Sequence, residues 1–211
     1  MDYCFYWINL DQDTNRKQYM ERILSENNIK NIRISAILGG LHKIDKELAC
    51  THSHLKAIRA FISSNEEIGI ICEDDLSFDY KPYWKNNIQD IINNAPKKWG
   101  IIQLGLILTK LYDDFSKYKS DYIPHVTNKY YSTICYVINR TSAKKLLNIK
   151  LIIDKRINYV ADHFIYSHVT TYTYKYPLFT YRDNNDSTIH PDHLNLHVKS
   201  KNLLLNFIKN Q

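Results

Sequence analysis

The sequence predicts an α/β protein in which a mixed, mostly parallel central sheet carries helices on both faces. Short runs rich in β-branched and aromatic residues alternate along the chain with segments whose apolar residues recur at helical spacing. One run, residues 68–75, is apolar at consecutive positions before it ends in carboxylates, as expected of a strand covered on both faces. Linkers rich in glycine or proline are absent from the sequence, so we expect one domain over residues 1–211.

The elements of the first half are signalled locally. Residues 3–10 are aromatic and apolar enough for a strand, and Asp13 or Thr14 can cap the helix that follows. A second strand is expected over residues 32–37, and a loop leads from it to a helix over residues 47–64. The strand at residues 68–75 comes next.

The middle of the chain begins with a helix after Pro82, with Trp84 and Ile88 on its apolar face, and this helix ends before Pro96. Residues 101–108 predict a further strand. Residues 111–129 are polar, aromatic and without periodicity, which predicts a long loop able to close over a ligand.

The last third repeats the alternation. Residues 133–138 predict a strand, and Thr141 is positioned to cap a short helix. A helix over residues 161–169, a strand over 171–174 and a closing amphipathic helix over 194–208 complete the chain.

Composition narrows the class of partner. The net charge of +6 permits phosphorylated ligands, but no run of five basic residues indicates a nucleic-acid-binding tail. No segment resembles a signal peptide or a membrane span, and four separated cysteines suit a reduced, cytoplasmic protein. The lysines of the closing helix leave peripheral contact with an anionic membrane open.

The carboxylates of Glu73, Asp74 and Asp75 are the first candidate site. Ligands bind at the carboxyl ends of strands in open α/β sheets, and three adjacent negative charges favour a hard divalent cation. The alternative is a solvated acidic turn. Arg16 and Lys17 add to the first interpretation, because cations in the first turn of a helix oppose its macrodipole and indicate an anion nearby; solvated surface charges are the alternative.

Several segments, taken in order, resemble glycosyltransferase family 25, the group that includes lipooligosaccharide galactosyltransferases and collagen β-galactosyltransferases. They are Trp7-Ile8-Asn9-Leu10 with Arg16-Lys17, Glu47-Leu48-Ala49-Cys50-Thr51-His52-Ser53-His54-Leu55, Cys72-Glu73-Asp74-Asp75-Leu76, Cys135-Tyr136-Val137-Ile138-Asn139-Arg140 with Ala143-Lys144-Lys145-Leu146-Leu147, and Val160-Ala161-Asp162. Each motif is weak alone, and their shared order makes chance agreement improbable.

The resemblance implies a GT-A-like, nucleotide-sugar-binding fold and transfer of a hexose, galactose or glucose, from a UDP-sugar. It also implies inversion at the anomeric carbon and a requirement for Mn²⁺ or Mg²⁺. The acceptor would be a hydroxyl of a glycan, a lipid-linked glycan or a protein. A catalytically degenerate relative that only binds nucleotide or glycan is the alternative, and Gln12, where many relatives have arginine, keeps it open.

The resemblance also assigns roles to residues. Glu73-Asp74-Asp75 looks like the Asp-x-Asp motif, with Asp75 on the metal and Glu73 or Asp74 on metal-bound water or the ribose. A third metal ligand is expected near the C-terminus, where His190 is preferred to Asp186. The donor-binding residues that the resemblance adds are Asn9, Leu10, Arg16 and His54.

Two of these assignments have competing interpretations. His54 can instead be a hydrogen-bonded histidine that ties its helix to the sheet. Asp162 matches the acidic residue expected to act as the general base, but an aspartate at the start of a helix can also be an N-cap; Asp154 is the reserve candidate.

Other metal chemistry is less well supported. Cys50, His52 and His54 alternate on a helix and therefore diverge, and the group of His190, His193 and His197 lacks a cysteine, so neither favours a zinc site. A metal-dependent nuclease would need a second acidic cluster, which the sequence does not offer.

Overall fold

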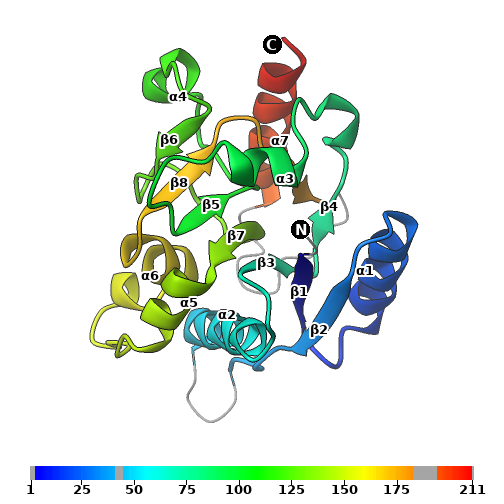
Figure 1. Cartoon of the computed structure of the whole chain (residues 1–211). Coiled ribbons are helices and arrows are strands. Elements are labelled where there is room, and N and C mark those ends of the chain that lie inside the picture. The colour runs from blue at the N-terminus through cyan, green and yellow to red at the C-terminus, as the bar shows by residue number, and fades with distance from the viewer. Residues whose placement is uncertain (1–2, 41–44, 183–193, 211) are drawn as a thin grey trace.

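The computed structural model describes residues 3–40, 45–182 and 194–210, and a seven-stranded sheet runs through them in the order β2-β1-β3-β7-β5-β8-β6 (Figure 1). Five strands point the same way, and β6 and β7 run against them. The predicted mixed, mostly parallel sheet is confirmed. The strands are β1 (Cys4–Asn9), β2 (Asn31–Ser35), β3 (Ile68–Glu73), β5 (Ile101–Gln103), β6 (Tyr122–Pro124), β7 (Cys135–Asn139) and β8 (Thr171–Tyr174).

Helices cover both faces of the sheet, as the continuous burial of β1 requires. On one face α1 (Thr14–Glu26) and α3 (Ile88–Asn93) pack on strand residues such as Phe5 and Trp7. On the other face α2 (Lys46–Ile62), α5 (Arg140–Leu147) and α6 (Ala161–Ser167) pack on strand residues such as Tyr6. The alternation of Phe5, Tyr6 and Trp7 between the two layers follows the period of a strand.

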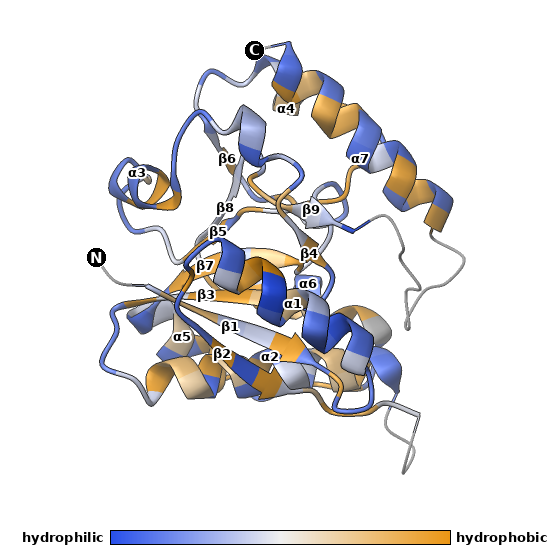
Figure 2. Cartoon of the chain, turned by 90° about the vertical axis from the view of Figure 1, so that its right-hand side faces the viewer, coloured by the Kyte–Doolittle hydropathy of each residue, from blue (hydrophilic) through white to orange (hydrophobic). Residues whose placement is uncertain are grey.

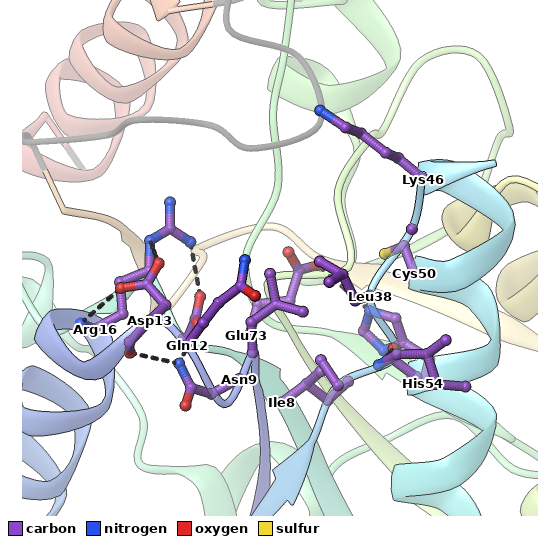
Figure 3. A pocket seen from close by; sticks show the side chains of 16 residues that line it. Ile8, Asn9, Gln12, Asp13, Arg16, Leu38, Lys46, Cys50, His54 and Glu73 are labelled. Carbon is purple, nitrogen blue, oxygen red and sulfur yellow. Dashed lines mark hydrogen bonds and ion pairs between the residues drawn. The ribbon is translucent and has the colours of Figure 1, made fainter. Parts of the chain in front are cut away.

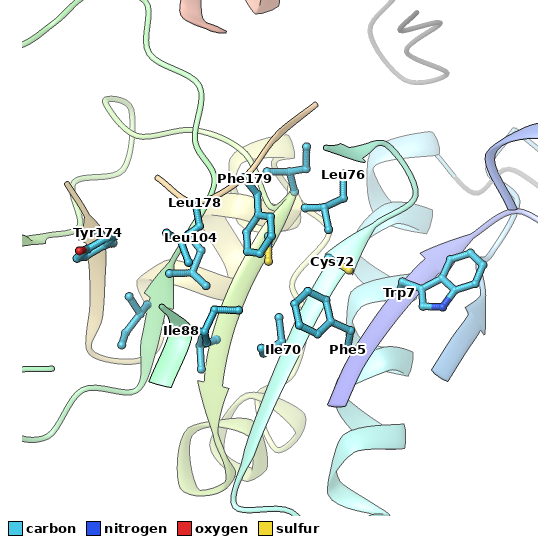
Figure 4. Packing of buried hydrophobic residues seen from close by; sticks show 14 of the residues in the cluster. Phe5, Trp7, Ile70, Cys72, Leu76, Ile88, Leu104, Tyr174, Leu178 and Phe179 are labelled. Carbon is cyan, nitrogen blue, oxygen red and sulfur yellow. The ribbon is translucent and has the colours of Figure 1, made fainter. Parts of the chain in front are cut away.

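Phe179 belongs to the apolar layer that α1 and α3 form with the sheet, and it packs on the strands of that face. Its ring meets Phe5 edge-on at 6.1 Å between centroids, and Figure 4 shows it above Ile70 and Cys72 of β3. A small second sheet holds it there, made of β4 (Leu76–Ser77) and β9 (Thr180–Tyr181) in antiparallel pairing. These two-residue strands have no sequence signal of their own.

A third apolar cluster lies beside β6, under α7 (Leu194–Lys209). Orange and blue alternate along α7 in Figure 2, as expected of an amphipathic helix with one side on the core. Phe115 of α4 (Asp113–Lys117) and Ile123 of β6 are buried in this cluster. The prediction of a long loop without secondary structure over residues 111–129 is therefore wrong, because elements of five and three residues are too short to show periodicity.

Further boundaries differ from the predicted ones. The strand expected over residues 101–108 ends at Gln103. The helix expected from Pro82 is split into a 3₁₀ turn, η1 (Lys81–Tyr83), and α3, which starts only at Ile88 after a capping box of Asn87 and Asp90. Asn139, not Thr141, caps α5 by accepting from the backbone N–H of Ser142. The other short turn is η2 (Arg156–Asn158).

The four cysteines are free thiols, as the sequence predicts. Among the described helices, none is long and apolar enough to cross a membrane.

Candidate functional site

The acidic tripeptide lies where β3 ends, between β1 and β7 in the sheet. Glu73 is the last residue of β3, and Asp74 and Asp75 form the turn into β4. Because β1 and β3 are parallel, the end of β1 lies beside this turn. That arrangement brings Asn9 and the first turn of α1 to the carboxylates.

Asp74 is held by the two residues that this neighbourhood supplies. Arg16 Nη1 donates to Asp74 Oδ1 at 2.7 Å, and Asn9 Nδ2 donates to Asp74 Oδ2 at 2.7 Å. Arg16 Nε also lies 3.4 Å from Asp13 Oδ2. The sequence predicted an anion near Arg16 in the first turn of α1. In this structure the anion that Arg16 contacts is the carboxylate of Asp74.

Asp75 is less well satisfied than its neighbour. Its Oδ1 is buried without a hydrogen-bond partner among the described residues, and its Oδ2 lies 3.8 Å from Arg16 Nη1. Burial, and then the charge of Glu73, raise the pKa of Asp75 to about 7. An unpartnered carboxylate oxygen beside a second carboxylate is a suitable environment for a hard divalent cation.

Glu73 makes contacts that keep it ionised. Its Oε1 accepts from Thr133 Oγ1 at 2.7 Å and lies 3.5 Å from His54 Nε2. Burial opposes ionisation, but the contacts with His54 and Thr133 outweigh it and lower the pKa of Glu73. His54 is fully buried, and its Nδ1 lies 3.3 Å from Tyr136 Oη. It thus ties α2 to the sheet and also faces the acidic motif.

Thr133 is a site residue that the sequence did not reveal. It lies beside Glu73 because β7 runs antiparallel to β3, with Cys72 opposite Cys135. The direction of β7 is a tertiary property, and a local pattern does not encode it.

A first cavity of about 500 Å³ opens on one side of Glu73. Its walls are the end of β1, the first turn of α1, residues 36–39 and the inner side of α2. Figure 3 shows Arg16 and Asp13 on one side, Cys50 and His54 on the other, and Glu73 between them. The predicted donor-binding residues all line this cavity: Asn9, Leu10, Arg16, His54, Glu73 and Asp74. Gln12 lines it as well.

A second cavity of about 710 Å³ is also lined by Glu73, and it brings together Asp75 and Asp162. Its walls come from the start of α6, residues 131–134, Tyr181 of β9 and the first turns of α7. Glu73 and Cys50 line both cavities, so the two cavities share a wall. The segment 111–129 contributes no described residue to either lining.

Asp162 is the second residue of α6, whose N-cap is Val160, so the interpretation of Asp162 as an N-cap is wrong. Its Oδ1 accepts from the backbone N–H of His163 at 2.9 Å, and its Oδ2 accepts a longer contact of 3.4 Å from that of Ser132. Asp154 is exposed, accepts from Asn158 Nδ2 at 2.6 Å, and lines neither cavity.

The predicted metal ligands are only partly covered by the structure. Asp75 lines the second cavity together with Glu73, which was expected to contact metal-bound water or the ribose, whereas His190 and Asp186 lie outside the described residues. Over residues 3–40, 45–182 and 194–210 no group of three or more histidine, cysteine, aspartate or glutamate side chains is arranged to hold a metal ion. Of the group His190, His193 and His197, only His197 is described, and it lines the second cavity.

Comparison with known proteins adds to this geometry. A sequence model of glycosyltransferase family 25 (LPS biosynthesis protein) matches residues 44–165. None of the curated protein sequences matches the chain significantly.

Two solved structures are similar to the chain to different degrees. A glycosyltransferase involved in glycosylation of the major capsid of PBCV-1 is 10% identical with a TM-score of 0.53, over 93% of this chain and 100% of that one. A Drosophila β-1,4-galactosyltransferase 7 in complex with manganese, UDP-Gal and xylobiose is 8% identical with a TM-score of 0.43, over 86% and 71%. The first likeness confirms the predicted GT-A-like fold class.

Proposed function

The chain belongs to glycosyltransferase family 25, and from this premise we propose that it moves galactose or glucose from a UDP-sugar to an acceptor hydroxyl with inversion at the anomeric carbon. One observation carries the proposal: Glu73 lines two cavities, of which the first is also lined by the expected donor-binding residues and the second by Asp75 and Asp162. A one-step inverting transfer needs the nucleotide and the attacking hydroxyl on opposite sides of the anomeric carbon, and two cavities with a shared wall suit that need.

The first cavity would hold the UDP portion of the donor. Asn9 and Leu10 would face the uridine, and Arg16 the diphosphate. Arg16 already balances Asp74, so a bound diphosphate would share its guanidinium with that carboxylate. The orientation of Arg16 is therefore fixed before the donor arrives, which reduces the entropy lost on binding.

Glu73 and Asp75 are the carboxylates that would hold Mn²⁺ or Mg²⁺, with His190 as the proposed third ligand. The unpartnered Oδ1 of Asp75 supports this fit. A divalent cation held there would stabilise the negative charge that grows on the departing diphosphate.

Asp162 would act as the general base. It would take the proton of the acceptor hydroxyl while the hydroxyl oxygen forms its bond to the anomeric carbon. The bond from that carbon to the diphosphate oxygen breaks, and UDP leaves with the electron pair. The backbone N–H groups of Ser132 and His163 fix the orientation of the carboxylate.

The lining of the second cavity favours an uncharged acceptor. It includes the carboxylates of Glu47, Glu73, Asp75 and Asp162, and no lysine or arginine among the described residues. A divalent cation bound by two of these four carboxylates would neutralise two negative charges, and the other two carboxylates would still face the acceptor. An anionic sugar would therefore be disfavoured, whereas the rings of Tyr131 and Tyr181 offer apolar surface to a neutral one.

Turnover of UDP-galactose and UDP-glucose with Mn²⁺ tests the proposal. We expect slow release of UDP by hydrolysis and faster release with an uncharged saccharide acceptor. Proton NMR of the product should show a β-linkage from the α-linked donor, and an α-linkage would contradict inversion. A protein that only binds nucleotide would raise its melting temperature with UDP and release none.

A further inference from the structure

Five exposed large aliphatic side chains lie on two stretches of the chain, and each stretch also contributes to the lining of the second cavity. Ile153 is 64% exposed, Ile152 56%, Ile157 48%, Val198 47% and Leu194 42%. They come from two stretches, residues 152–157 after α5 and the first turns of α7. We refer to these five residues as the aliphatic rim.

Both stretches of the aliphatic rim belong to the cavity. Ile157 lines it from one stretch, and Leu196 and His197 line it from the other. Scattered exposed aliphatic residues are normal on a protein surface, but a concentration around one opening marks an interaction site.

The first stretch stands on an ordered base. Leu151 packs against the core between the sheet and α2. Tyr159 accepts a hydrogen bond from Thr51 through its carbonyl, and its hydroxyl donates to Asp45 Oδ2 at 3.2 Å. Ile152 and Ile153 are therefore presented to solvent by a segment that is fixed to α2 on one side.

Positive charges accompany the aliphatic rim. Lys150 and Lys155 bracket Ile152 and Ile153 and are exposed, and exposed Lys199 directly follows Val198. Residues 150–157 hold three basic residues against one acidic residue, Asp154. Aliphatic side chains next to lysines are the combination that enters the boundary of an anionic bilayer, where the lysines meet lipid phosphates.

We propose that the aliphatic rim docks the protein on an anionic lipid surface, with the second cavity opening toward that surface. The cationic flanks favour this partner over a second copy of the chain, because two copies would bring like charges together. The docking proposal does not depend on the proposed function. If the protein is a glycosyltransferase as proposed, docking would also bring a lipid-anchored acceptor to Asp162, and this consequence rests on the proposed function.

Co-sedimentation with vesicles tests the docking in the absence of donor and metal. The full chain should bind vesicles of phosphatidylcholine with phosphatidylglycerol, and bind phosphatidylcholine alone much more weakly. The double variant Ile152→Ser with Ile153→Ser should lower binding at least about tenfold, since two aliphatic side chains leave the interface. Lys150→Gln with Lys155→Gln should lower vesicle binding about tenfold and weaken its dependence on salt.

Ile32→Ser is the matched control, because Ile32 is 46% exposed on β2 and lines neither cavity. It should bind vesicles as the wild type does, and all variants should keep the wild-type melting temperature. Absence of binding to anionic vesicles, or equal loss in Ile32→Ser and the double variant, would overturn the proposal. A second contradicting outcome would be a wild-type dimer in light scattering together with a monomeric double variant. That outcome would assign the aliphatic rim to a contact between two copies of the chain. Release of UDP from the donor is also measured for protein in solution without vesicles. Release without vesicle binding would contradict docking alone, whereas vesicle binding without release would contradict the proposed function alone.

Discussion

Arg16 Nη1 lies 2.7 Å from Asp74 Oδ1, and this pair joins the first turn of α1 to the end of β3. The side chains are only 14% and 11% exposed, so removal of one partner leaves a charge that is mostly buried. We expect Arg16→Gln to lower the free energy of unfolding by about 3 kcal/mol. Urea unfolding measures it.

The matched control for this prediction is Arg22→Gln, because Arg22 forms a salt bridge with Glu26 on the same helix with side chains 59% and 57% exposed. Arg22→Gln should lower the free energy of unfolding by less than about 0.5 kcal/mol. In a double-mutant cycle Arg16→Gln and Asp74→Asn should be non-additive by about 1–3 kcal/mol. Additivity would show that the two residues act independently.

Asp162→Asn removes the proposed base and nearly preserves the shape of the side chain. We expect kcat for sugar transfer to fall by about 10²–10⁴ while the affinity for UDP changes little, because Asp162 lies outside the first cavity. Steady-state kinetics and calorimetry with UDP measure the two effects. Asp154→Asn is the control, and a comparable loss of kcat there would move the base to the reserve candidate.

Manganese binding should depend on pH through Asp75. Its pKa of about 7 lies above its ordinary value of 3.8, so between these pH values the folded protein holds a proton that the unfolded chain has released. The contribution of Asp75 to metal-free stability is thus fully present below about pH 3.8 and is lost progressively as the pH rises to about 7.

Metal binding displaces this proton, so the affinity for Mn²⁺ should rise by up to about tenfold per pH unit below pH 7 and level off above it. Glu73 has a lowered pKa and stays ionised over this range. Calorimetric titrations between pH 5.5 and 8 measure the dependence. An affinity that is constant over this range would contradict the assignment of Asp75.

Asn139 is the observed N-cap of α5, whereas the sequence predicted Thr141. Asn139 accepts from the N–H of Ser142 and donates to the carbonyl of Trp99. We expect Asn139→Ala to lower the free energy of unfolding by about 2 kcal/mol, and Thr141→Ala, at an exposed position, to change it by less than about 0.5 kcal/mol. Thermal unfolding of the two variants, side by side, distinguishes them; the reverse order would restore Thr141 as the cap.

The features that the sequence predicted correctly are those with a local cause. The run before Glu73 is apolar because both faces of β3 are covered, and the periodicity of α1 and α2 reflects one buried side. The end of β1 lies beside the carboxylates because parallel strands share an edge. Family resemblance added the residues expected to bind the donor, and the structure gathers them in one cavity, while their role stays a prediction.

The missed features have causes distant in the chain. The contact of Thr133 with Glu73 depends on the direction of β7. The sequence offered the tie of His54 to the sheet as one interpretation, but the identity of its partner, Tyr136, depends on the packing of α2 against the sheet. Phe115 and Ile123 looked like loop residues because their burial comes from α7, about eighty residues further along the chain.

The central claim is that Asp75 and Glu73 form the metal-binding part of a nucleotide-sugar site. Titration of wild type and Asp75→Asn with Mn²⁺, followed by release of UDP from the donor, tests it most directly. We expect EDTA to abolish release by the wild type, Mn²⁺ to restore it, and Asp75→Asn to need at least about a hundredfold more Mn²⁺. Full activity in EDTA, or the same Mn²⁺ requirement in the variant, would contradict the claim.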